Sequence, residues 1–368
     1  MREILEESIQ RLLTDQVTPE AMRLAESGEW PETLWTLIEE SGFTLATVHE
    51  NSGGSGLSWP DVYPIIFAAG QHTLPLPLPE TMLAAWLLDQ SGMAVPSGPM
   101  TVVDSTGESQ IQVERNGDGW QLSGTLHGVP WGRFAGYAVV EVELDKVSQF
   151  ALVALKDLHQ RHDLNLAREP RDTITLLRTD VIAMAPVPAF LGPLPIRFYG
   201  AMIRSAQMAG AMTKLVQQSV QYAGDRIQFG KPIAKFQAIQ QQLAVLGCEC
   251  AATGAGAAFS FERAGHPDSQ LAIAAGKLRA SEAAGQASSI AHATHGAIGF
   301  TYEHTLHFAT RRLWSWRSEF GHAGWWARRI GTMVFKSERP FWEIVTGAEA
   351  IDLSISLADI STGLRETA

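Results

Sequence analysis

Residues 226–233 read RIQFGKPI, followed by FQ at 236–237. A helical pattern ends just before it, and the Gly/Pro pair predicts a short turn before a second helix begins. The turn presents the planar guanidinium fork of Arg226, which suits a diphosphate. The side-chain amides of Gln228 and Gln237 add donors for a polar cofactor. The stretch therefore predicts a cofactor-binding turn between two helices.

Outward from this turn, the hydrophobic pattern divides the chain into three parts. Residues 1–95 follow the 3.6-residue period of amphipathic helices. Residues 96–190 change to a period of two with many β-branched side chains, which predicts a central β domain. Residues 191–368 return to the helical period and are rich in alanine, which favours close helix packing in a bundle.

The central part shows the clearest local signals. Short strands are predicted at 101–103, 111–114 and 120–122, with further strands up to 177. The sequence Asn-Gly-Asp-Gly at 116–119 predicts a hairpin turn, because these residues tolerate positive φ. Several short strands with turns between them are typical of a small barrel or sandwich.

Composition and charge exclude several classes of protein. The 368-residue chain has a formal net charge of −11, which argues against nucleic acid and anionic membrane surfaces as partners. Its acidic start is unlike a signal peptide, and no run approaches about 18 consecutive apolar residues. Cys248 and Cys250 are two residues apart on a predicted helix, which fits neither a disulfide nor a zinc site. A cytoplasmic location is predicted.

The turn at 226–233 resembles the signature of the acyl-CoA dehydrogenase family. Two further segments are similar to family motifs: GGSGL at 53–57 and HGAIGFT at 295–301. The second departs from the family's Gln-x-x-Gly-Gly-x-Gly-Phe turn, because Ala293 replaces the glutamine and Ala297 the second glycine. The resemblance implies an α+β fold with an N-terminal helical domain, a central β-barrel or sandwich and a C-terminal helical bundle.

The same resemblance implies FAD as the cofactor. In the family, the turn holds the ADP half of a flavin that lies mainly on the neighbouring subunit, and the glycine-rich turn approaches the flavin closely. Trp131 lies where the family carries a tryptophan strand, although a core tryptophan is the commoner explanation. The cofactor-binding residues implied are Arg226, Gln228, Phe229, Gln237, Gly296, Ala297 and Trp131.

The catalytic machinery matches the family less well. The flavin-cradling Thr-Glu-Pro-Gly-x-Gly-Ser loop has no match at residues 102–108. Aligned on Arg311, the position of the family's glutamate base holds Phe320, with Glu319 one residue early, a rotation of about 100° on a helix. A subgroup carries its base on the first C-terminal helix, where this chain has Gly200-Ala201. Glu319 is therefore the candidate catalytic residue, and the base is in doubt.

Residues 300–307 resemble family members that work as two unlike chains. We hypothesise the smaller subunit of such an acyl-CoA dehydrogenase, which oxidises the α,β-bond of an acyl-CoA by proton abstraction and hydride transfer to flavin. A steroid side chain is one possible acyl group. A homologous partner chain or a homo-oligomer, and an electron-transferring flavoprotein as acceptor, are implied. The alternative is a non-catalytic scaffold that completes the FAD site of its partner.

Two clusters leave other interpretations open. Four histidines at 292, 295, 304 and 307 suggest a metal, but a di-iron site needs paired Glu-x-x-His motifs, and the sequence shows none. We therefore predict no metal. Four tryptophans at 314, 316, 325 and 326 fit an acyl pocket or a core or subunit interface equally well.

Overall fold

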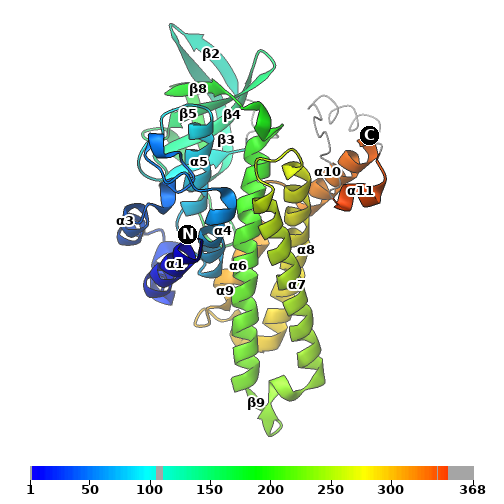
Figure 1. The fold of residues 1–368 in the computed structure, drawn as a ribbon. Coiled ribbons are helices and arrows are strands. Elements are labelled where there is room, and N and C mark those ends of the chain that lie inside the picture. The colour runs from blue at the N-terminus through cyan, green and yellow to red at the C-terminus, as the bar shows by residue number, and fades with distance from the viewer. Residues whose placement is uncertain (1, 105–110, 338, 347–368) are drawn as a thin grey trace.

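The computed structural model describes residues 2–104, 111–337 and 339–346. A long central helix, α6 (Pro195–Asp225), runs from the β domain to the opposite end of the molecule (Figure 1). The N-terminal helices lie against one side of its upper half, α7, α8 and α9 pack against it, and α10 packs on α8. This order of helices, sheet and helices confirms the fold predicted from the sequence.

The N-terminal part is a set of helices around one apolar core. The helices α4 and α6 approach each other with almost no side chain between them at two glycines. A Cβ on Gly70 would lie 2.0 Å from the Gln207 carbonyl oxygen, and one on Gly210 would lie 2.1 Å from that of Phe67. The elements are α1 (Arg2–Gln16), α2 (Pro19–Glu26), α3 (Glu32–Glu40), η1 (Phe43–Leu45), η2 (Glu50–Ser52), α4 (Trp59–Gln71) and α5 (Leu78–Gln90).

The central domain is a sandwich of two four-stranded sheets, ordered β1-β4-β5-β8 and β2-β3-β7-β6. Alternate side chains of the two sheets share one apolar core. The hairpin predicted at 116–119 is present, with Asn116 paired to Gly119. The strands are β1 (Met100–Val103), β2 (Gln112–Asn116), β3 (Gly119–Pro130), β4 (Tyr137–Leu144), β5 (Val147–Ala154), β6 (His159–Arg161), β7 (Arg171–Asp180) and β8 (Ala183–Pro186).

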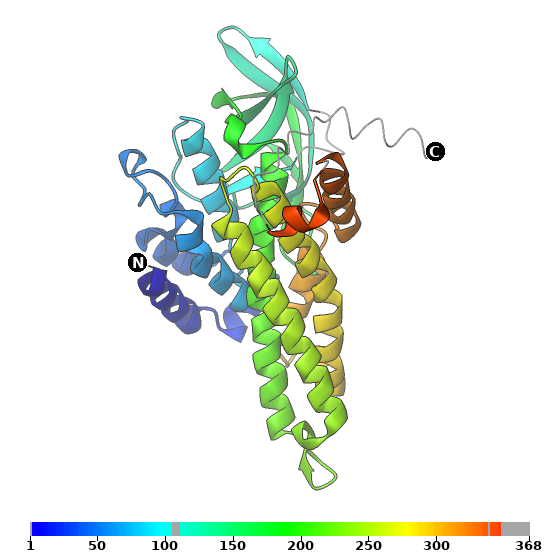
Figure 2. The same cartoon turned by 45° about the vertical axis from the view of Figure 1, so that its right-hand side comes forward.

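The C-terminal part is a bundle in which α6, α7 and α8 run side by side (Figure 2). Its elements are η3 (Ala189–Leu191), α6, β9 (Ile227–Gln228), β10 (Lys231–Pro232), η4 (Ile233–Lys235), α7 (Gln237–Glu262), α8 (Ser269–His295), η5 (Gly296–Phe300), α9 (Leu306–Trp316), α10 (Ala323–Lys336) and α11 (Phe341–Thr346).

The helix α7 is unusually exposed for its composition. By length and apolarity alone it meets the criteria for a membrane span, although one such helix is weak evidence. Only 22% of its most apolar 18-residue window is buried within the chain. Its apolar outer face therefore has no cover from the residues that the structure describes.

Candidate functional site

The cofactor-binding turn predicted from the sequence is a small hairpin at the far end of the bundle. The backbone N–H of Arg226 caps α6 by donating to the Tyr222 carbonyl at 2.9 Å. Strands β9 and β10 then pair antiparallel, and the turn between them places Phe229 and Gly230 at φ +50° and +78°. Glycine adopts this left-handed region without strain, which explains its place in the turn.

This hairpin presents unused groups to its surroundings. Among the described residues, the Arg226 guanidinium has no hydrogen bond or ion pair, and Gln237 is exposed at the start of α7. The Gln228 amide instead donates to its neighbour's carbonyl, that of Ile227, at 2.8 Å. The side chain of Phe229 is 93% exposed. An unpaired cation and an exposed aromatic ring on one hairpin are typical of a contact surface.

The second predicted turn lies at the same end of the bundle. Gly296, at φ +63°, ends α8, and both it and Ala297 are exposed. The ring of the preceding His295 stacks on Tyr222 with centroids 4.6 Å apart, which ties this turn to the end of α6. The structure therefore brings Arg226, Gly296 and Ala297 to one region.

The seventh predicted residue, Trp131, lies at the other end. It follows strand β3 in the β domain, where its side chain is 6% exposed. The β domain reaches α6 as far as Arg204, because Arg171 and Arg204 both donate to Glu319, and the 22 residues from Arg204 to Arg226 span about 33 Å. One dinucleotide cannot contact both Trp131 and Arg226 of the same chain. These two predicted contacts require two different chains.

A cavity of about 190 Å³ lies where the β domain meets the bundle. Its described walls are mixed: Val102, Val103, Pro130 and Phe320 are apolar, whereas Asp104, His127, Arg171 and Glu319 are polar or charged. Binding pockets for cofactors and drug-sized ligands enclose roughly 300–1,000 Å³. The described walls therefore form a space too small for a flavin ring.

The two base positions inferred from the family meet beside this cavity. The Phe320 ring lies so close to Gly200 of α6 that a Cβ there would be 2.4 Å from the ring. Phe320 itself adopts a left-handed φ of +53° and is nearly buried. The two positions inferred separately for the base, 200 and 320, are therefore adjacent in the structure. A phenyl ring occupies that place, and neither position carries a carboxylate.

The candidate base Glu319 points into a cluster of buried charges. Arg171 donates to its two carboxylate oxygens at 2.9 and 3.0 Å, and Arg204 donates to one of them at 2.7 Å. Burial alone raises the pKa of a carboxyl, but these two guanidiniums outweigh it and lower the pKa of Glu319 to about 2. An ionised carboxylate with both oxygens occupied is a weak proton acceptor.

The cluster joins all three parts of the chain. Arg204 of α6 also donates to Glu80 of α5 at 2.6 Å. Arg171, which begins β7, pairs with Glu169 at 3.0 Å, and Arg312 of α9 pairs with the same carboxylate at 3.0 Å. Three carboxylates thus face three guanidiniums, which balances their charges. Buried ions are tolerated only when paired in this way.

Sequence reasoning missed this cluster, although one signal was available. Arg204 stands within an otherwise apolar and small-residue stretch of α6, and a charge in a buried helix face needs a partner. Its partners Glu80 and Glu319 lie more than 100 positions away along the chain and carry no local pattern. Their pairing is visible only in three dimensions.

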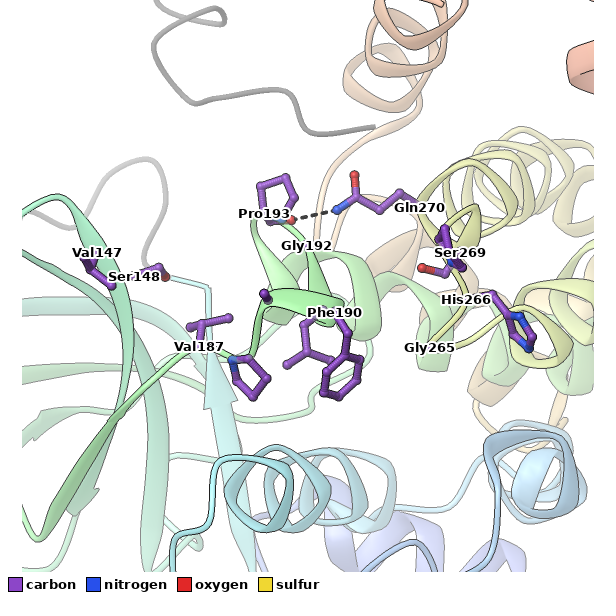
Figure 3. A pocket seen from close by; sticks show the side chains of 14 residues that line it. Val147, Ser148, Val187, Phe190, Gly192, Pro193, Gly265, His266, Ser269 and Gln270 are labelled. Carbon is purple, nitrogen blue, oxygen red and sulfur yellow. Dashed lines mark hydrogen bonds between the residues drawn. The ribbon is translucent and has the colours of Figure 1, made fainter. Parts of the chain in front are cut away.

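A separate cleft of about 550 Å³ lies where the β domain meets the top of the bundle (Figure 3). It lies between the segment 187–193 that enters α6 and the turn 265–270 between α7 and α8. Gln270 spans its edge by donating to the Pro193 carbonyl at 3.2 Å, as the figure shows. The described lining includes Phe190 and several valine and proline side chains but no lysine or arginine. It therefore offers nothing that neutralises a diphosphate.

The side chains of the four histidines pack against aromatic rings and against one another. His292 stacks on Phe300 at 4.4 Å, and His304 meets His295 edge-on at 4.8 Å. Burial lowers the pKa of each of these three imidazoles, which favours their neutral forms at pH 7. Within the described ranges, no three His, Cys, Asp or Glu side chains are placed to share a metal ion.

Two family models match the chain. The acyl-CoA dehydrogenase N-terminal domain matches residues 2–94, and the C-terminal domain of the same family matches residues 199–321. Together they cover more than half of the sequence.

Individual proteins of this family are distant but nearly full-length matches. The acyl-CoA dehydrogenase IpdE2 of Mycobacterium tuberculosis is 27% identical over 84% of this chain and 90% of its own length. FadE27 of the same organism is 26% identical over 79% and 85%.

Solved structures share the fold. The ChsE4-ChsE5 complex from Mycobacterium tuberculosis superposes with a TM-score of 0.84 at 22% identity, covering 92% of this chain and 98% of the matched one. The butyryl-CoA dehydrogenase of Megasphaera elsdenii gives 0.80 at 18% identity, over 90% and 98%. The family and the fold predicted from the sequence are confirmed, and FAD is the cofactor of this family. On its sequence and its architecture, this chain belongs to the acyl-CoA dehydrogenase family.

Proposed function

We propose that this chain is the flavin-completing subunit of a two-chain, FAD-dependent acyl-CoA dehydrogenase. Its Arg226 hairpin takes the diphosphate of a flavin held mainly by the β domain of a homologous partner, and the partner supplies the base. The observation that carries this proposal is the distance of about 33 Å along α6 between Arg226 and Arg204, the residue that this chain's own β domain reaches through Glu319.

The state of this chain's own active-site region supports a non-catalytic role. Abstraction of the weakly acidic proton next to a thioester needs a carboxylate base in a dry site. Gly200 and Phe320 stand at the two places from which such a base would act, and Glu319 is neutralised by Arg171 and Arg204. We therefore propose that Glu319 holds the domains together and removes no proton.

The cavity beside Phe320 also supports a partner that holds the flavin ring while this chain contacts the diphosphate. The described walls do not fit a flavin ring, whereas the distal hairpin fits a diphosphate through one free guanidinium. A two-chain unit would then hold one flavin, between the partner's β domain and this chain's hairpin. When bound, the flavin would supply the acceptor for the hydride that leaves the β-carbon. This chain holds the cofactor only through Arg226. Gln237 lies on the same exposed surface.

The exposed surfaces favour a protein partner. The helix α7 leaves its apolar outer face uncovered, and Phe229 is 93% exposed beside Arg226. An apolar helix and an aromatic anchor next to a cation are typical of subunit interfaces. The relative ChsE4-ChsE5 was solved as a complex of two chains. We propose a homologous partner, an acyl-CoA substrate on that partner, and an electron-transferring flavoprotein as acceptor.

We propose a steroid side chain as the class of acyl group that the complex oxidises. One solved relative with a TM-score of 0.81 is described as a steroid acyl-CoA dehydrogenase, at 23% identity. Such a substrate would lie in the partner, because the base and the flavin ring belong there.

Co-expression with a homologous chain tests the proposal. We expect the isolated chain to be colourless, and the purified pair to contain one flavin per two chains by visible absorption. Arg226→Ala should lower flavin retention by the pair about tenfold or more, since charge-assisted contacts contribute about 1.5–3 kcal/mol. Arg328→Ala removes another exposed arginine, on α10, and serves as the matched control.

Two results would overturn the proposal. The first is a homomeric preparation that binds flavin and bleaches it with an acyl-CoA. The second is unchanged flavin content in the Arg226→Ala pair.

A further inference from the structure

One buried arginine of the bundle has no anion beside it. The described residues include four buried arginines, of which Arg171, Arg204 and Arg312 each face a carboxylate at 3.0 Å or less. Arg329 of α10 is the exception. Its Nε and Nη2 are buried and have no hydrogen-bond partner in the described part of the chain. Because a buried cation needs an anion, Arg329 indicates one that the described residues do not supply.

The described surroundings of Arg329 are aromatic. Its guanidinium carbon lies 5.7 Å from the centre of the Phe198 ring, and the Trp326 ring meets the same phenyl edge-on at 5.1 Å. A ring face attracts a cation but offers its N–H groups no oxygen. Burial lowers the pKa of Arg329, and no carboxylate within the described ranges offsets this effect. Burial acts on Arg204 as well, but the carboxylates beside Arg204 outweigh it and raise the pKa.

An exposed apolar surface follows this arginine along the chain. Four large side chains are between 58% and 88% exposed: Phe335 on α10, and Phe341, Trp342 and Val345 on α11. Of the residues of α11, Ile344 alone is buried, so this short helix turns most of its apolar side chains outward. We call these four residues the C-terminal apolar surface. Such clusters of exposed apolar side chains mark contacts with another segment or chain.

The sequence that follows α11 contains both missing elements. Residues 347–368 lie outside the residues that the structure describes, and they include four acidic residues and one arginine. Helix α10, in contrast, has three basic residues and no acidic one. Residues 351–357 read IDLSISL, in which apolar and polar side chains alternate. In an extended chain, alternate side chains lie on one side, so this apolar row would share its side with Glu349 and Asp359.

We propose that residues 349–357 bind to α10 and α11 of the same chain, with the Glu349 carboxylate on Arg329 and the apolar row on the C-terminal apolar surface. Glu349 follows Thr346, the last residue of α11, by three positions, which is at most about 11 Å of extended chain. Asp359 is ten positions further along the sequence.

The segment bound in this way closes the C-terminal apolar surface to other proteins. Three observations favour this occupant: the opposite charges of α10 and the segment, the alternating apolar row, and the direct continuation of the chain from α11. A partner subunit would then contact the chain elsewhere. The inference does not depend on the proposed function.

Hydrogen exchange of the 368-residue chain tests the contact directly. We expect the backbone amides of residues 349–357 to exchange at least about tenfold more slowly than in a free peptide of the same sequence. Glu349→Gln should remove most of this protection, because a charge-assisted contact is lost. Asp352→Asn is the matched control, since that carboxylate lies on the other side of the row, and it should leave the protection unchanged. Exchange of the wild-type segment at the rate of the free peptide would overturn the proposal.

A second pair of variants tests the apolar row. Leu353→Asp places a charge within the row and should abolish the protection of residues 349–357. Ser354→Asp places the same charge on the opposite side of the segment and should leave the protection in place. Equal loss in the two variants would show that added charge, and not the apolar row, controls the exchange, and the proposed contact would be wrong.

Arg329→Met tests the contact from the side of α10. It should lower the protection as much as Glu349→Gln does, and the double variant should lose no more than either single variant. Unchanged protection in Arg329→Met would sink the inference. If that variant does not fold, Trp342→Ser gives the same test at an exposed position and should also lower the protection.

A homologous partner chain is the competing occupant of this surface. Protection of residues 349–357 that is absent in the chain alone and appears only after such a partner is added would assign the surface to that partner. This outcome would overturn the inference. It is separate from the effect of Arg226→Ala on flavin content, so either proposal can fail alone.

Discussion

Replacing Glu319 with glutamine removes one charge from the buried cluster at the junction of the three domains. The variant keeps the shape of the side chain but leaves Arg171 and Arg204 short of one negative charge. The carboxyl has a pKa of about 2 in the folded chain, against an ordinary value of 4.5. At 1.36 kcal/mol per pKa unit, this difference corresponds to about 3 kcal/mol of stability at pH 7. That agrees with the ~3–5 kcal/mol lost when one partner of a buried ion pair is removed.

The pH dependence gives the prediction its sign. Because the pKa is lower in the folded state than in the unfolded chain, the stabilisation is fully present above about pH 4.5. It is lost as the pH falls toward about 2. The difference in unfolding free energy between wild type and Glu319→Gln should therefore be about 3 kcal/mol at pH 7 and should shrink below pH 4.5.

Urea unfolding followed by tryptophan fluorescence, between pH 3 and pH 8, measures this difference. Glu40→Gln, at an exposed position of α3, is the matched control and should change the stability by less than about 0.5 kcal/mol. A Glu319→Gln variant that is destabilised by less than about 1 kcal/mol at pH 7 would refute the reasoning. So would a difference that does not change with pH.

Three further perturbations follow from particular contacts. Gly200→Ala should destabilise the chain by about 1–3 kcal/mol in urea unfolding, because its Cβ meets the Phe320 ring. Adding Phe320→Leu to this variant should restore part of the lost stability. If the effects of the two substitutions are additive, the contact is contradicted. Burial lowers the pKa of Lys277 to about 7, so wild-type stability should rise between pH 7 and pH 10, and Lys277→Met should abolish the rise. Phe229→Ser should weaken co-purification with the partner by at least tenfold; unchanged yield would place the interface elsewhere.

The order of the three parts could be predicted from the sequence because each has its own periodicity. The hairpin at Asn116–Gly119 was predicted from its turn residues and is present with that register. The parallel pairing of β1 with β4 was not predicted. Strands β2 and β3 lie between β1 and β4 in the sequence, so no local pattern connects the two. Local sequence patterns identify hairpins, whereas the pairing of parallel strands depends on how the complete sandwich packs.

The site was predictable only in pieces. Arg226 and its hairpin were predicted from eight contiguous residues, and the structure places that turn at an exposed end of the bundle. The convergence of Gly200 and Phe320 was not predictable, since 120 positions separate them and each was inferred from a different alignment. The charges around Glu319 were likewise missed, because four separate elements contribute them.

The contact between Arg204 and Phe320 determines what a carboxylate introduced at position 320 would meet. The guanidinium carbon of Arg204 lies 5.6 Å from the centre of the Phe320 ring. A glutamate introduced at position 320 would meet that cation and become a third anion within its reach, beside Glu319 and Glu80. It would be captured as an ion pair before it reached a substrate. A single substitution at position 320 would therefore add a further member to the buried charge cluster and would not give this chain a free base.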